Sequence, residues 1–303
     1  MRKYLLLLLL ISAASARAEW TLTGVSHAPD RRKFVDLKTV QPSGNYLRVW
    51  TMYDADKEES TPAGLKFRSA KQLEELDCAR GQGRVLALAF SGGNMGGGSV
   101  VPSELNLPTS FAVLRPGSMN EITAHVVCNL DAYLVQPKKW EPIGEADGMS
   151  LFIDRMAARR VGAVARVRVM YDFTTPRPRT GGEFAARSQV TVSEYDCGKR
   201  VYRHISLIDY SGQGGKGHAT AILVAPEAPF MANSSNDLAD TACAVAAAAP
   251  ALEPTATPPV SSAVRWPGVT GSAADPATSM QSAVQRCTAD QAAQPPRVGG
   301  ACQ

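Results

Sequence analysis

The chain has 303 residues, of which 45% are hydrophobic and 20% charged, and its formal net charge is +4. Three positive charges lie in the first eighteen residues, so the rest of the chain carries 4 − 3 = +1. A near-neutral chain without a broad basic field is a poor match for nucleic-acid binding. No run approaches the about 20 apolar residues of a membrane-spanning helix, so no transmembrane segment is expected.

Residues 1–18 have the composition of a secretory signal peptide. A basic start and an apolar run over residues 5–11 are followed by small residues just before Glu19. Cleavage is expected before Glu19, which predicts an exported protein, either periplasmic or extracellular at the cell surface. No cysteine stands near the cleavage point, so we expect no lipid anchor.

The stretches that begin at Trp20 and at Trp140 run in parallel, about 119 residues apart. The matched segments are KFVDLKTV (33–40) with LFIDRMAA (151–158), LRVWTMYD (47–54) with ARVRVMYD (165–172), KFRSAKQLEELDC (66–78) with FAARSQVTVSEYDC (184–197), and SGGNMGGG (91–98) with SGQGGKG (211–217). So many matches in one order indicate a duplicated domain. We expect one copy over residues 19–130 and the other over 137–244.

The cysteine count is even, which in an exported chain predicts disulfides. In chain order the cysteines are Cys78, Cys128, Cys197, Cys243, Cys287 and Cys302. The duplication pairs the first with the second and the third with the fourth, because these are equivalent positions in the two copies. Each bridge closes a loop of about 50 residues and stabilises by roughly 4 kcal/mol. The last two cysteines pair with each other or with another chain.

Within each copy the hydrophobic pattern predicts mainly strands. Alternating side chains of β-rich composition indicate strands at 46–54, 84–90 and 201–210. A helix is expected within residues 116–128, where Ser118 stands three residues before Glu121 as a capping box. The predicted fold class is α+β, mainly β, with two tandem small antiparallel sheets that are each flanked by one helix.

Residues 245–303 form an Ala- and Pro-rich segment with few charges. Such a composition cannot bury enough apolar surface to offset the conformational entropy that ordering would cost. We therefore expect a disordered, low-complexity tail that follows the second copy.

The order of short motifs in the first copy resembles the surface-adhesin protein E family. The motifs are the leading Trp20, RVWTMYD (48–54), RS (68–69) ahead of DC (77–78), SGGNMGGG (91–98), and PGS (116–118) ahead of Cys128. The resemblance implies a curved antiparallel sheet flanked by a helix that the disulfide pins. It also implies a non-enzymatic role, because the best-known members bind host matrix and plasma proteins such as vitronectin, laminin and plasminogen.

The glycine-rich segment 91–98 raises the question of a phosphate-binding loop. Neither copy has the G-K-[ST] sequence that such a loop requires, and its recurrence in both copies favours a tight turn. The four histidines show no zinc-like spacing, and Asp36 and Asp154 are expected to accept hydrogen bonds in equivalent turns. We predict no catalytic residue, no cofactor and no metal.

The sequence favours a protein partner, and the oligomeric state stays open. Basic side chains in three short segments are the candidate binding surface: Arg31, Arg32 and Lys33, then Lys138 and Lys139, then Arg177 and Arg179. Trp20, Trp50 and Trp140 are either core anchors or aromatic contacts for a partner. The leading hypothesis is an exported adhesin-type binding protein. The alternative is a periplasmic structural or inhibitor-like protein that meets only components of the cell envelope.

Overall fold

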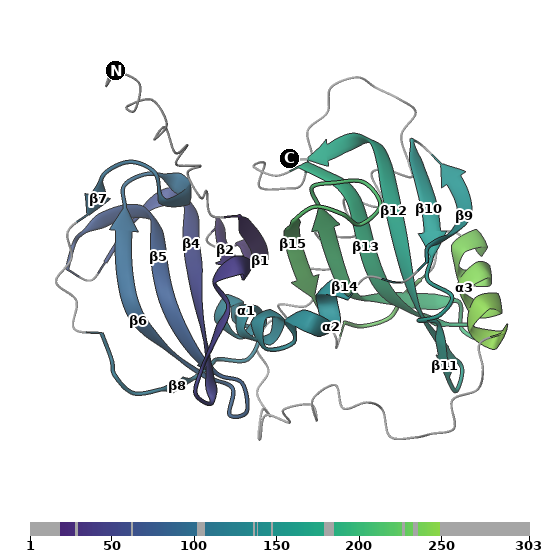
Figure 1. The fold of residues 1–303 in the computed structure, drawn as a ribbon, viewed down its shortest axis with the longest axis horizontal. Helices are drawn as coiled ribbons and strands as arrows, with labels where there is room; N and C mark the ends of the chain where they lie inside the picture. The colour runs from purple at the N-terminus through teal and green to yellow at the C-terminus, as the bar shows by residue number, and fades with distance from the viewer. Residues whose placement is uncertain are drawn as a thin grey trace, which may run out of the picture.

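A computed structural model of the chain describes residues 19–27, 30–61, 63–101, 107–135, 137, 139–146, 148–178, 185–225, 228–232 and 236–248. The signal segment, most of the tail with its last two cysteines, and the basic residues Lys138 and Arg179 lie outside these ranges. The described part is mainly β (Figure 1), as the sequence predicted.

The first copy, called the first repeat below, contributes eight strands and a helix that ends at its second cysteine. The strands are β1 (Trp20–His27), β2 (Asp30–Asp36), β3 (Gln41–Ser43), β4 (Tyr46–Ser60), β5 (Lys66–Asp77), β6 (Gln82–Ser91), β7 (Val100–Val101) and β8 (Ala112–Val113). Two 3₁₀ turns, η1 (Leu37–Thr39) and η2 (Asn94–Gly96), and helices α1 (Met119–Cys128) and α2 (Leu130–Leu134) complete this half.

The second repeat builds eight strands and a helix in the same order. They are β9 (Glu141–Ala146), β10 (Met149–Ile153), β11 (Arg159–Val161), β12 (Val164–Pro178), β13 (Ala185–Asp196), β14 (Val201–Tyr210), β15 (Ala219–Val224), β16 (Met231–Ala232) and helix α3 (Asn236–Ala248). Because α3 runs to Ala248, the first four residues that the sequence assigned to the tail belong to a helix, and Val245 and Ala246 are buried.

The prediction of two separate antiparallel sheets is wrong. Strand β1 of the first repeat pairs in parallel with β15 of the second, where Leu22 lies opposite Ala221, and the sixteen described strands form one mixed sheet. Both strands are outer strands of their own repeats, and an outer strand presents unpaired N–H and C=O groups that another strand can satisfy. Thr21 strengthens the junction by donating its hydroxyl to the carbonyl of Ala219 at 2.7 Å.

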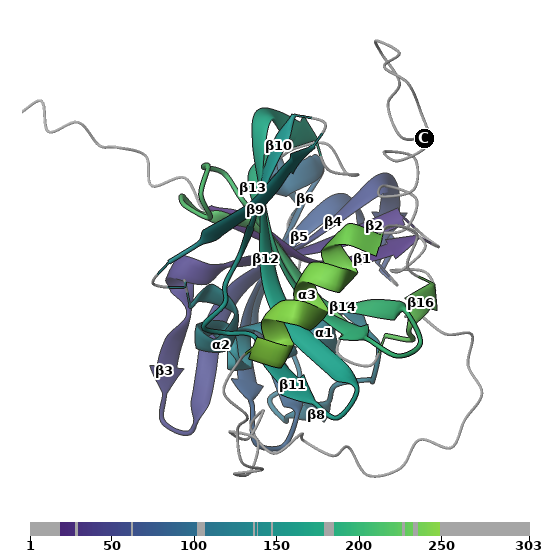
Figure 2. The same cartoon turned by 90° about the vertical axis from the view of Figure 1, so that its right-hand side faces the viewer.

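The two repeats are flipped relative to each other in the joint sheet. The face that carries the repeat's own helix is on one side of the sheet in the first repeat and on the other side in the second. Side chains alternate between faces along a strand, and in β12 Val169 contacts α3 whereas Met170 contacts the cluster around Val126 of α1. Helices α1 and α2 therefore cover one face of the second repeat and α3 covers the other. Figure 1 shows α1 and α2 beneath the junction, and Figure 2 shows α3 across the strands of the second repeat.

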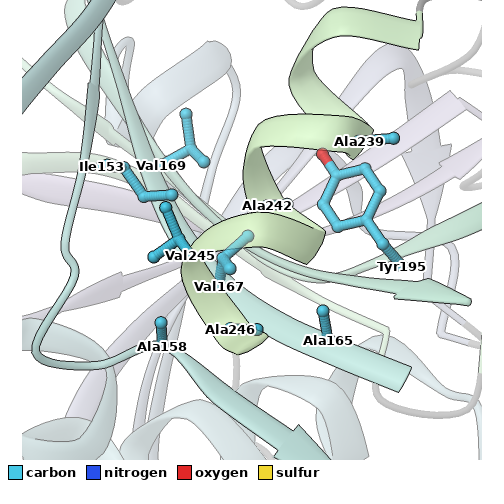
Figure 3. Close-up of a cluster of buried hydrophobic side chains, with 10 residues drawn as sticks. All are labelled: Ile153, Ala158, Ala165, Val167, Val169, Tyr195, Ala239, Ala242, Val245 and Ala246. Atoms are coloured by element: carbon cyan, nitrogen blue, oxygen red, sulfur yellow. The ribbon is translucent and has the colours of Figure 1, made fainter. Parts of the chain in front are cut away.

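Each repeat has a core under its own helix. Under α3 the core consists of small and apolar side chains (Figure 3), namely Ile153, Ala158, Ala165, Val167, Val169, Tyr195, Ala239, Ala242, Val245 and Ala246. The disulfides Cys78–Cys128 and Cys197–Cys243 tie each helix to the end of a strand, and these are the pairs that the duplication predicts. Ser118 caps α1 by accepting the Glu121 N–H at 3.2 Å.

Candidate functional site

The glycine-rich segments are turns that fold back over the sheet. Ser69 of β5 donates its hydroxyl to the carbonyl of Gly93 at 2.6 Å and accepts the Gly96 N–H at 2.9 Å. Ser188 makes the same two bonds in the second repeat, to Gly212 and Gly215. The serine of the recurring R-S motif therefore anchors this turn in both repeats. The N–H groups of Gly96 and Gly215 donate to these serines within the protein and not to a phosphate.

A recurring aspartate holds the other side of the same turn. Asp54 of β4 is fully buried and accepts the Met95 N–H at 2.7 Å, and Asp172 accepts the Gly214 N–H at 2.9 Å. Glycine is needed at Gly98 because its φ is +72° and an added Cβ would lie 2.9 Å from the Gly93 nitrogen. The Y-D, R-S and glycine motifs are therefore three parts of one structural unit.

Two of the predicted basic residues, Arg32 and Lys33, form ion pairs within the protein. Lys33 is 2% exposed and pairs with Glu74 of β5 at 2.6 Å. Arg32 pairs with Asp54 and Asp56, both at 2.8 Å.

The other described members of the set reach the surface, but far apart in the chain. Arg31 is half-buried, pairs with Glu59 at 2.6 Å and lies 5.5 Å from the Tyr53 ring centroid. Arg177 lies 4.5 Å from the Phe173 ring, and Lys139 is exposed between the repeats. In the sheet, β1, β15, β14 and β13 lie between Arg31 on β2 and Arg177 on β12, so these two residues do not form one patch.

A more coherent surface lies on the face of the first repeat that points away from α1. We call it the open face, and it comprises Trp50, Lys71, Leu73, Ala89 and Met95. Trp20 is only 8% exposed and lies beneath it as a core anchor. Lys71 is exposed, and its ammonium lies 5.7 Å from the ring centroids of both Trp20 and Trp50. Such contacts are favourable cation–π interactions. The described helices α1 and α3 lie on other parts of the sheet.

The equivalent face of the second repeat is covered. There Met170, Val190 and Ile208 pack against Val126 of α1, with partly buried side chains of α2 and Trp140 around them. The strand registers place Val190 where the first repeat has Lys71 and Arg168 where it has Trp50. The same sheet face is thus an internal contact in one repeat, whereas in the other it carries the exposed Lys71 beside the half-buried Trp50.

Both repeats carry a buried glutamate between two arginines, a feature that the sequence comparison missed. Glu75 pairs with Arg48 and Arg84, at 2.8 and 2.5 Å. Burial opposes ionisation of this carboxyl, but hydrogen bonds from both guanidinium groups outweigh it and hold its pKa below the usual range. The signal was present, because Arg and Glu recur at these positions in the two aligned segments.

The second repeat has the same triad around Glu194. It pairs with Arg166 and Arg203, and its pKa is also lowered, by the two guanidinium groups acting against burial. An aromatic ring covers the outer arginine of each triad: Phe111 over Arg84 at 4.5 Å and Phe230 over Arg203 at 4.7 Å. These contacts hold the segment before each helix onto the sheet.

Two of the described histidines are held by hydroxyl groups of neighbouring side chains. His204 lies 2.9 Å from the Ser193 hydroxyl, and burial lowers its pKa to about 4. His125 lies 2.8 Å from the Tyr133 hydroxyl, and burial lowers its pKa too. Within the described ranges no three His, Cys, Asp or Glu side chains gather as metal ligands would.

The two predicted turn aspartates, Asp36 and Asp154, accept N–H groups of their own turns, from Lys38 at 3.2 Å and Ala157 at 3.1 Å.

These observations define a class: tandem sheet-and-helix domains, each pinned by one disulfide. Two segments, residues 20–129 and 140–245, match the family model described as surface-adhesin protein E. They span well over half of the chain, and the chain belongs to the surface-adhesin protein E family. Membership implies export or display at the cell surface and a protein or matrix partner.

A comparison with solved structures matches the chain to structures of protein E from Haemophilus influenzae. One is 15% identical, with a TM-score of 0.30, and covers 40% of this chain and 91% of the other. A second is 16% identical, with a TM-score of 0.29, and covers 40% and 82%. No curated protein matches the chain, and no helix of the described ranges is long and apolar enough to cross a membrane.

Proposed function

We propose that this protein is an exported adhesin-type binding protein whose open face engages a host extracellular-matrix or plasma protein, without a catalytic step. Vitronectin, laminin and plasminogen are the partners to test first. The observation that carries the proposal is the contrast between the repeats: one copy of this face is covered by the chain itself, and the other carries the exposed Lys71 and the half-buried Trp50.

The chemistry of the open face suits a protein ligand. Tryptophan is enriched among the residues that dominate binding energy at interfaces, and its large ring contributes most when a partner desolvates it. Lys71 is exposed beside two indoles, so a partner carboxylate can reach its ammonium without breaking an internal ion pair of the described residues. Apolar contact and one accessible charge together favour a specific protein contact.

Binding to immobilised vitronectin, laminin and plasminogen tests the proposal with two variants. Trp50→Arg and Lys71→Glu should each weaken binding at least tenfold, because the first removes the aromatic contact and the second reverses the accessible charge. Trp50→Arg introduces the residue that the second repeat carries at this position, which favours a folded variant. The control is Lys57→Glu, an equal charge reversal at an exposed lysine of the same repeat. Equal weakening by the control would exclude the open face.

The alternative is a periplasmic structural or inhibitor-like protein that meets only envelope components. Protease added to intact cells of the native organism separates the two. Loss of the protein while a periplasmic marker survives would support surface display. Survival of the protein would remove host adhesion and leave the open face as a site for a periplasmic partner.

A further inference from the structure

We infer that a row of arginines on the second repeat binds a carboxylate-rich segment of a partner protein. The row runs across four neighbouring strands as Arg159 (β11), Arg166 (β12), Glu194 (β13) and Arg203 (β14), each directly opposite the next. Directly opposed side chains of antiparallel strands lie on the same face. This surface is separate from the open face and lies on the opposite side of the joint sheet, so the inference does not depend on the proposed function.

The row has more positive charge than the fold neutralises. Glu194 uses one carboxylate oxygen for Arg166 and the other for Arg203, so three arginines less one glutamate leave +2. Arg159 donates to the carbonyls of Met156 and Ala158, at 2.7 and 2.8 Å, and has no carboxylate partner among the described residues. Like charges placed directly opposite one another in a sheet are destabilising. An anion between Arg159 and Arg166 would relieve that repulsion.

The first repeat shows that the fold itself does not require this charge. Its equivalent row is Gln41, Arg48, Glu75 and Arg84, in the same register. The triad around the glutamate is common to both repeats, and the neutral Gln41 occupies the place of Arg159. The second repeat therefore has one arginine beyond the shared structural triad, at an exposed position.

The surroundings of the row indicate a peptide rather than a simple anion. Met156, beside Arg159, is 81% exposed, and Phe230, over Arg203, is 38% exposed. Neighbouring strands are about 4.8 Å apart, so the row spans about 14 Å, the length of about four extended residues. Guanidinium groups match carboxylates in a bidentate geometry, and Met, Arg and aromatic residues are enriched at protein interfaces. A short acidic segment with apolar residues at its ends fits this arrangement.

Fluorescence anisotropy on the full mature chain tests the inference at low salt. The probe is a labelled peptide of four glutamates between a phenylalanine and a leucine. Arg159→Gln introduces the residue of the first repeat and leaves Glu194 with both its partners, so we expect a folded protein that binds the probe about five- to tenfold more weakly. Gln41→Arg should build a second row in the first repeat and raise the stoichiometry from one peptide to two.

A neighbouring arginine supplies the matched control. Arg160 is exposed, points to the opposite face of β11 and donates to the carbonyl of Gly162, so Arg160→Gln should change probe affinity less than twofold. The inference fails if Arg159→Gln binds within twofold of wild type or if a glutamine version of the probe binds equally well. It also fails if heparin or phosphatidylserine vesicles bind in an Arg159-dependent way while the peptide does not, since the row would then serve a glycan or a lipid.

Discussion

The two repeats share their strand order and disulfide, yet they fill the space under the helix with different chemistry. In the first repeat the buried ammonium of Lys33 lies 2.6 Å from Glu74 and 2.5 Å from the Asn120 side chain of α1. Thr51 donates to the same glutamate at 2.8 Å. Here a polar network joins the helix to the sheet.

In the second repeat the same positions hold Leu151, Ser193 and Val169, and α3 rests on apolar side chains. Ser193 lies 2.9 Å from His204, which stands where the first repeat has Val85. The fold therefore tolerates either solution, because the polar side chains of the network pair with one another and the apolar side chains need no such partner.

The largest expected difference between the repeats is in the loss of stability when a charge is placed at equivalent positions of α1 and α3. Val126 of α1 is fully buried against Met170, Ile208 and Ile222 of the other repeat. Val126→Asp should lower the free energy of unfolding by more than about 4 kcal/mol, because it buries a charge without a partner. Thr241→Asp, the equivalent change in α3, should cost less than about 1 kcal/mol. Urea unfolding followed by circular dichroism measures both, and equal losses would contradict the described junction.

Removing one partner of the buried Lys33–Glu74 pair should lower the free energy of unfolding much more than replacing both partners. Lys33→Leu alone should cost about 3–5 kcal/mol, because Glu74 then loses its counter-charge. The double variant Lys33→Leu with Glu74→Ser carries the residues of the second repeat, and it should recover all but about 1 kcal/mol. A double-mutant cycle from urea unfolding gives the coupling directly. Additive losses would show that the pair is not coupled.

Lowering the pH should reduce the free energy of unfolding through protonation of His204 in the second repeat. Its pKa is about 4 in the folded protein and about 6.5 when unfolded, so the unfolded state takes up the proton first as the pH falls. The stability from the neutral ring is complete above pH 6.5 and is lost between pH 6.5 and 4, by no more than about 3 kcal/mol. His204→Val introduces the residue of the first repeat, and it should make the urea midpoint of unfolding less dependent on pH over this window. An unchanged pH slope would refute the assignment.

The glycine turns should respond alike in both repeats. Ser69→Ala and Ser188→Ala each remove two hydrogen bonds to the turn backbone. Each change should cost about 1–2 kcal/mol, because a backbone N–H and a C=O lose their partner. The two losses, measured by thermal unfolding, should agree within about 0.5 kcal/mol. A clear difference would show that the turns are not equivalent.

Much of one repeat follows from the sequence alone. Alternation of apolar side chains locates the long strands, and Ser118 with Glu121 marks the start of α1, because both signals depend only on neighbours along the chain. Comparison of the two copies selects the disulfide pairs and identifies the glycine segments as turns. These features are local or repeated, so they can be recognised without knowing how distant segments meet.

Only the tertiary structure decides how the copies join and which surfaces stay accessible. The β1–β15 pairing depends on backbone groups of Leu22 and Ala221, and backbone hydrogen bonding leaves little trace in side-chain patterns. The burial of Lys33 could not be predicted either. A sequence does not distinguish a basic side chain at the surface from one that is buried in an ion pair. The open face and the arginine row exist because strand register brings residues from distant segments onto one side of the sheet.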